Sequence, residues 1–109
     1  MTSRIAPRRP LEVAAFAGVV EHLTKFCFDS KAVGVMAVGA IRDDFRRKRS
    51  DTIKDLSALL GTVKTQGIRN AIRLALRDLY KAAEDEENAL AQLKALVAEN
   101  DQAIQAEKK

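Results

Sequence analysis

One stretch of the chain, from about Gln66 to Glu107, constrains the fold more than any other. Positions in alternating steps of four and three residues are mostly apolar there, and this spacing lines one side of an α-helix. The series is Ile72, Leu76, Leu79, Ala83, Glu86, Leu90, Leu93, Val97, Asn100 and Ile104, and only Glu86 and Asn100 are polar. No Pro or Gly follows Gly67, so the sequence predicts one continuous helix from Gln66 to Glu107.

A helix of that size would be about 60 Å long, which is more than a domain of this size covers from one side. We therefore expect its distal half to need a partner helix, and the pattern favours a second copy of the chain. The residues predicted to form this self-association or partner interface are Leu90, Leu93, Val97, Asn100 and Ile104. Asn100 would set the register, as a buried Asn does in coiled coils. The alternative is a monomeric four-helix bundle in which an earlier helix packs along this stripe.

The composition predicts an all-α fold. The chain has 109 residues, which suits one domain, and 47% of them are apolar but only 5% aromatic, so Ala, Leu, Val and Ile fill the core. We expect an apolar helical hairpin, a short third helix and one long C-terminal helix, which together make a four-helix, coiled-coil-like dimer. The expected segments are a flexible basic arm (1–9), a helical globular body (10–83) and the distal part of the long helix with an acidic segment (84–109).

The first two predicted helices, 11–28 and 31–48, form the apolar hairpin. Residues 32–41 contain two Gly and several β-branched residues, so a buried strand is an open alternative there. Helix is preferred because the chain offers no second strand for pairing. Ser50 or Asp51 is expected to cap a third helix over 52–60, and Gly61 to end it in the left-handed conformation.

Nothing in the sequence indicates an enzyme, a metal site or a cofactor. His22 and Cys27, the only His and the only Cys, are five residues apart and so do not share a helix face. The acidic run 84–87 points around a helix rather than toward one ligand, so we assign no catalytic and no metal-binding residue. The longest apolar runs, 13–20 and 32–41, are too short to span a bilayer, and no signal-peptide pattern is evident. We therefore expect a cytoplasmic protein that is not in a membrane.

Charge is unevenly distributed along the chain. The net charge is +4, but residues 1–83 carry 16 Lys or Arg against 8 Asp or Glu, whereas residues 84–109 carry 3 against 7. A basic body with an acidic end is compatible with an anionic partner, and equally with antiparallel self-association.

Residues 52–77 resemble a helix-turn-helix loosely, with Gly61 at the turn. In that interpretation the residues that contact nucleic acid are Lys64, Gln66, Arg69, Asn70 and Arg73. The fit is imperfect, because the turn is one residue too long and Gly67 would lie inside the recognition helix.

These patterns together predict a non-enzymatic small regulatory or adaptor protein. It would act by helix-mediated protein–protein binding, plausibly on a transcription or signalling protein, and would form a homodimer. The alternative is a DNA-binding transcriptional regulator that uses residues 52–77.

Overall fold

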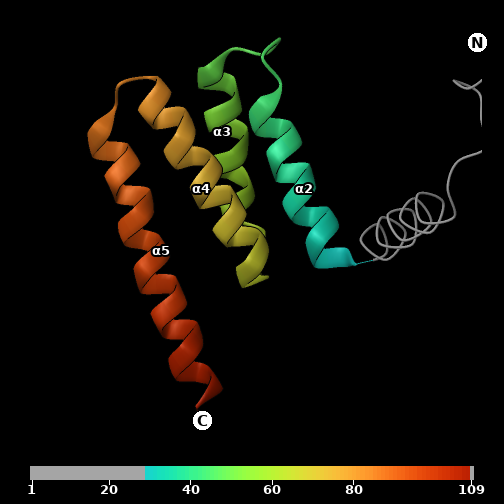
Figure 1. Ribbon diagram of the computed structural model, residues 1–109, viewed down its shortest axis with the longest axis vertical. Coiled ribbons are helices and arrows are strands. Elements are labelled where there is room, and N and C mark those ends of the chain that lie inside the picture. Colours follow the sequence, from blue (N-terminus) through green and yellow to red (C-terminus); the bar gives the residue numbers. More distant parts are fainter. Residues whose placement is uncertain (1–28, 109) are drawn as a thin grey trace, which may run out of the picture. The chain divides into compact units, whose positions relative to one another are not determined.

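Residues 29–108 are described by a computed structural model of the chain, and they contain four helices. These are α2 (Ser30–Asp43), α3 (Arg49–Leu60), α4 (Gln66–Ala82) and α5 (Glu86–Glu107), shown in Figure 1. No strand occurs within this range, so the all-α prediction is confirmed and residues 32–41 are helical. The arm predicted over 1–9, the helix predicted over 11–28, and His22 and Cys27 lie outside the described residues.

The packing between helices described below lies within one compact unit that begins at Gly34. At the start of α2 the carboxylate of Asp29 accepts a hydrogen bond from the backbone N–H of Ala32 (3.0 Å), which makes Asp29 the cap of this helix. The helix ends at Asp43, five residues earlier than expected. Asp44 accounts for this end, because its carboxylate accepts from the backbone N–H of Arg46 (3.1 Å) and so stabilises a turn.

Helix α3 begins earlier than expected, with Lys48 at the N-cap and no side-chain cap. The prediction that Ser50 or Asp51 caps this helix is therefore wrong. Asp51 lies instead in the first turn, where its negative charge suits the helix dipole. Gly61 follows the last residue of α3 with φ −73°, so the predicted left-handed ending is also wrong. Its N–H donates to the carbonyl of Ala58 (3.1 Å) and the N–H of Thr62 donates to that of Leu59 (3.1 Å), which continues the right-handed turn.

The predicted single helix from Gln66 to Glu107 is interrupted, and this is the main correction to the sequence analysis. The C-terminal helix is long, but it begins at Glu86. Glu84 takes the left-handed conformation (φ 60°) between α4 and α5. The N–H of Asp85 donates to the carbonyl of Tyr80 (2.8 Å) and that of Glu84 to Lys81 (3.0 Å). This is the Schellman pattern of a helix end, which satisfies carbonyls that would otherwise lack donors.

The start of α5 explains why the break falls here. The carboxylate of Asp85 accepts hydrogen bonds from the backbone N–H of Asn88 (3.1 Å) and from its side-chain amide (2.7 Å). These two bonds, the side-chain one first, lower the pKa of Asp85. Glu86 and Glu87 add negative charge to the first turn, where the helix dipole favours it. The acidic run is therefore a helix start, which a heptad count does not detect because Glu86 keeps the spacing.

Helix α4 is central to the compact unit that begins at Gly34. It packs along α5 on one side, in an antiparallel hairpin, and against α3 on another (Figure 1). The buried core consists of Val38 from α2, Leu56 from α3, and Ile72, Ala75 and Leu76 from α4. Helix α2 approaches α4 closely at Gly34, because a Cβ atom there would lie 2.6 Å from Cδ1 of Ile68. None of the helices between residues 29 and 108 is long and apolar enough to cross a membrane.

Candidate interaction surface on the C-terminal helix

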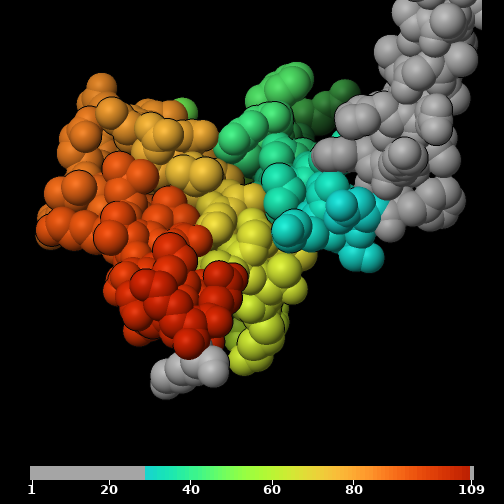
Figure 2. Space-filling model, turned by 60° about the horizontal axis from the view of Figure 1, so that its bottom comes forward, coloured from blue at the N-terminus to red at the C-terminus, as the bar shows by residue number. Residues whose placement is uncertain are grey.

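Helix α5 has one face on α4 and one face in solvent. On the α4 side Ala89 is buried, with 3% of its surface exposed. On the solvent side four large apolar residues are exposed, with these exposed fractions: Leu90 (51%), Leu93 (39%), Val97 (72%) and Ile104 (51%). We call these four residues the apolar seam. Figure 2 shows the C-terminal part of α5, in red, at the surface with no other described helix over it. The seam contains four of the five residues that the sequence predicted for an interface.

The opposite, α4-facing side of α5 is polar at its centre. Glu99 accepts hydrogen bonds from Nε of Arg69 at Oε1 (2.9 Å) and from Nη2 of Arg73 at Oε2 (2.7 Å). Arg69 also donates to the backbone carbonyls of Leu60 (2.5 Å) and Val63 (3.0 Å), at the end of α3 and in the loop after it. One carboxylate and two guanidinium groups thus join the end of α3, α4 and α5.

The protonation state of this cluster follows from its hydrogen bonds. The guanidinium of Arg69 is the largest cause that lowers the pKa of Glu99 to about 2, with smaller contributions from Gln66 and Arg73. In return, the hydrogen bond with Glu99 raises the pKa of Arg69. The side chains of these three charged residues are only 18–20% exposed, so solvent screens their interaction less than it would on the surface.

Two amides extend the cluster along the hairpin. Asn70 and Asn100 bond reciprocally, with Nδ2 of Asn100 donating to Oδ1 of Asn70 (2.8 Å) and Nδ2 of Asn70 donating to Oδ1 of Asn100 (3.1 Å). Asn100 also donates to the carbonyl of Leu96 (2.7 Å), one turn earlier in α5. The residue that the sequence placed in an interchain seam therefore bonds within its own chain, at the edge of the apolar seam.

Four of the five residues of the helix-turn-helix interpretation lie in the α4–α5 interface. Gln66, Arg69, Asn70 and Arg73 all form hydrogen bonds across the α4–α5 hairpin, and only Lys64 is exposed. Sequence reasoning missed Glu99 and Gln92, the α5 residues that hold these arginines; Gln92 accepts from Arg73 (3.0 Å). Two features of the sequence could have indicated these partners. The arginines recur every four residues, and a helix break at the acidic run would fold Glu99 back onto them.

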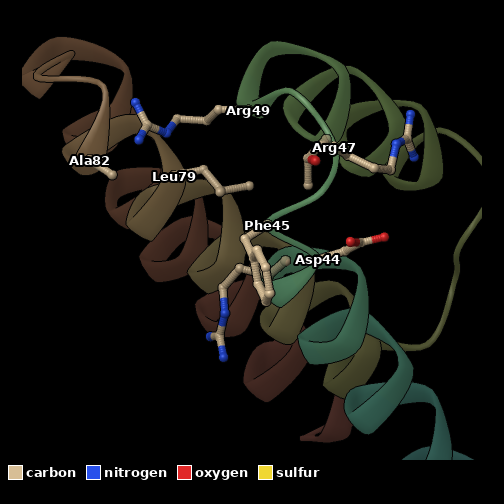
Figure 3. Close-up of a pocket in the computed structure, with 8 residues that line it drawn as sticks. Asp44, Phe45, Arg47, Arg49, Leu79 and Ala82 are labelled. Atoms are coloured by element: carbon tan, nitrogen blue, oxygen red, sulfur yellow. The ribbon is translucent and has the colours of Figure 1, made fainter.

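A second feature is a cavity of about 310 Å³ between the α2–α3 connection and the end of α4. Figure 3 shows Asp44 and Phe45 on the connection, Leu79 and Ala82 on α4, and the side chains of Arg47 and Arg49 extending to opposite sides. Phe45 is 93% exposed. Two of the arginines that line this cavity are already paired: Arg42 binds Asp43 (2.8 Å) and Asp78 (3.3 Å), and Arg47 binds Asp55. The cavity is therefore an open hollow with a mixed polar and apolar lining, and much of its positive charge is balanced by carboxylates.

In the part of the chain that the structure describes, no group of three or more His, Cys, Asp or Glu side chains is arranged to hold a metal ion. Comparison of the chain with protein-family models, with curated proteins and with solved structures found no match. Any functional assignment therefore depends on the geometry of the chain itself.

Proposed function

We propose that this protein is a non-enzymatic regulatory or adaptor protein that acts by helix-mediated protein–protein binding through the apolar seam of α5. The proposed target is a transcription or signalling protein. The observation that carries the proposal is the exposure of Leu90, Leu93, Val97 and Ile104 on one side of a helix whose other side is packed. Their spacing matches the anchors by which an amphipathic helix lies against a second helix.

The apolar surface extends beyond α5. Leu74 on α4 is 43% exposed and lies one turn after Asn70, which bonds to Asn100 at the edge of the seam. Helical spacing therefore puts Leu74 on the side of α4 that borders the apolar seam. Several large apolar residues exposed on neighbouring helices are typical of interaction sites. Two helices of the hairpin thus offer a platform for a partner helix.

DNA binding is not proposed as a second function. It would need the guanidinium groups of Arg69 and Arg73 to reach phosphates or bases, whereas both bind Glu99 within the chain. Replacing them with Ala would also loosen the hairpin, so loss of DNA binding by such variants would be uninformative. Lys64, which is exposed, is the better residue with which to test the nucleic-acid interpretation.

The test compares proteins captured from cells by the wild-type chain, by Leu93→Asp and by Lys64→Glu. Leu93→Asp places a charge in the seam, and we expect it to remove at least one captured protein that Lys64→Glu retains. Circular dichroism should show the same helix content in all three, because both positions are exposed. Capture that survives Leu93→Asp but is lost with Lys64→Glu or with nuclease would contradict the proposal and favour nucleic-acid binding.

A further inference from the structure

Four charged residues run along one edge of the apolar seam. They are Glu87, Lys94, Asp101 and Lys108, each exposed and each seven residues from the next. A seven-residue step returns to nearly the same side of a helix, so the four form a single row with signs that alternate along α5. Within residues 29–108 none of the four forms an ion pair, so their charges are available to a partner.

The position of this row distinguishes two ways of pairing helices. With Leu90, Val97 and Ile104 at the a positions and Leu93 and Asn100 at the d positions, the charged row occupies the e positions. In a parallel pair, e residues face the g residues of the partner, which here are the uncharged Ala89, Leu96 and Ala103. In an antiparallel pair, e residues face e residues, so only that orientation brings the charged row against itself.

We propose that the apolar seam binds the apolar seam of a second copy of this chain, with the two α5 helices antiparallel. Lys94 of each copy then lies opposite Asp101 of the other, and Glu87 opposite Lys108. All four contacts across the interface join opposite charges. This inference rests on the proposed function, because it assigns an occupant to the same surface.

The charges also select the register. In the proposed alignment Leu93 packs against the second copy's Ile104, and Leu90 lies beside Glu107 at the exposed end of the pair. Val97 lies beside Asn100, whose amide is already bonded to Asn70 and to Leu96. A slip of one heptad toward the N-terminus keeps an apolar layer, with Leu93 against Val97. However, it places Lys94 opposite Lys94 and Glu87 opposite Asp101. Like charges at these positions disfavour the slipped pair, so the row acts against the competing register.

The g positions, on the other side of the helix pair, are also compatible with an antiparallel dimer. The g positions lie on the side of α5 that faces α4, where Leu96 and Ala103 are partly buried. Each copy would bring Leu74 of α4 to that side. Two hairpins that meet in this way form a four-helix arrangement, in which the charged row is on the solvent edge and the uncharged positions are inside.

The experiment is charge reversal at Lys94 and Asp101, with self-association measured by sedimentation equilibrium. Lys94→Glu alone puts Glu opposite Asp101, and Asp101→Lys alone puts Lys opposite Lys94. Either single variant should raise the dissociation constant of the dimer at least about tenfold, because two attractions become two repulsions. The double variant restores opposite charges and should dimerise as the wild type does. Lys54→Glu, on the exposed face of α3, is the matched control and should have no effect.

Mixing the two single variants gives the sharpest result. In a mixed pair, the glutamate introduced at position 94 of one copy faces the lysine introduced at position 101 of the other. The native Asp101 of the first copy faces the native Lys94 of the second, so all these contacts join opposite charges. Native mass spectrometry of the mixture should therefore show mixed dimers in excess over either pure dimer. That result requires the two positions to face each other, which the antiparallel pair provides.

Two outcomes would overturn this inference and separate it from the proposed function. If Leu93→Asp dissociates the dimer but the charge reversals do not, the seam is an interaction surface and the antiparallel assignment is wrong. If the wild-type chain is monomeric at all concentrations up to about 1 mM, a second copy is not the occupant. The capture experiment with Leu93→Asp then decides separately whether the seam serves another protein.

Discussion

At the scale of single residues, Glu99 is the acidic side chain on which the hairpin depends most. It accepts hydrogen bonds from Arg69, Arg73 and Gln66, which are all on α4. Both arginines are about four-fifths buried in their side chains, so removal of the carboxylate would leave positive charge in a poorly solvated place. The cluster is therefore more important for folding than an exposed surface ion pair.

We predict that Glu99→Gln lowers the free energy of unfolding by about 2–3 kcal/mol, because a neutral amide does not balance the two guanidinium groups. Urea unfolding followed by circular dichroism measures this change. Glu107→Gln, on the exposed last turn of the same helix, is the control and should change the free energy by less than about 0.5 kcal/mol. Equal effects of the two substitutions would contradict the role assigned to Glu99.

The same carboxylate makes stability depend on acidity. Its pKa is about 2 in the folded chain and 4.5 ordinarily, so folding favours the ionised form. The resulting stabilisation is fully present above about pH 4.5 and is lost as the pH falls through 2, with a total of about 2–3 kcal/mol. Unfolding measured from pH 5 to pH 2 should show a steeper loss for the wild type than for Glu99→Gln. Parallel curves for the two would contradict this assignment.

At the scale of elements, the turn at residues 83–85 decides the architecture. A non-glycine residue in the left-handed conformation is uncommon, and Glu84 adopts it at the end of α4. The strain is compensated by the hydrogen bonds of the helix end and by the cap that Asp85 supplies to α5. Without this turn, α5 would extend away from α4 and Glu99 would not reach Arg69 or Arg73.

Glu84→Gly should raise the free energy of unfolding by about 0.5–1 kcal/mol, because glycine occupies this conformation without steric cost. Thermal or urea unfolding measures the gain. Glu84→Ala is the control that removes the same carboxylate but keeps a Cβ atom, so it should not produce the gain. A glycine variant no more stable than the alanine variant would show that the backbone conformation is unstrained.

Helical content was predictable from the sequence because periodicity and the scarcity of Gly and Pro report on local preference. The break in the long helix was not, since Ala83 and Glu86 keep the four–three spacing through it. The candidate surface was likewise predictable in part. The exposed Leu90, Leu93 and Val97 were recognised from their spacing. The intrachain partners of Arg69 and Arg73 depend on the turn, and so the basic stripe suggested a nucleic-acid surface instead.

At the scale of the whole molecule, the self-association proposed for the uncovered face of α5 would link stability to concentration. The proposed dimerisation through the apolar seam would stabilise only the folded state, so the proposal predicts that the unfolding temperature of the wild type rises with protein concentration. Above the dissociation constant, each tenfold rise in concentration adds about 1.4 kcal/mol per mole of dimer. Calorimetry at several concentrations measures this, and Leu93→Asp should show a constant unfolding temperature. A constant temperature for the wild type as well would count against self-association.

The short connection between α4 and α5 also bears on how quickly the chain folds. Only Ala83, Glu84 and Asp85 separate the two helices, so contacts across the hairpin join residues at most about 40 positions apart in the sequence. Closing so small a loop costs little chain entropy, and helices form locally within about a microsecond. The α4–α5 hairpin can thus form before α2 and α3 pack against it. The surface that a partner would recognise is complete as soon as α4 and α5 have packed together.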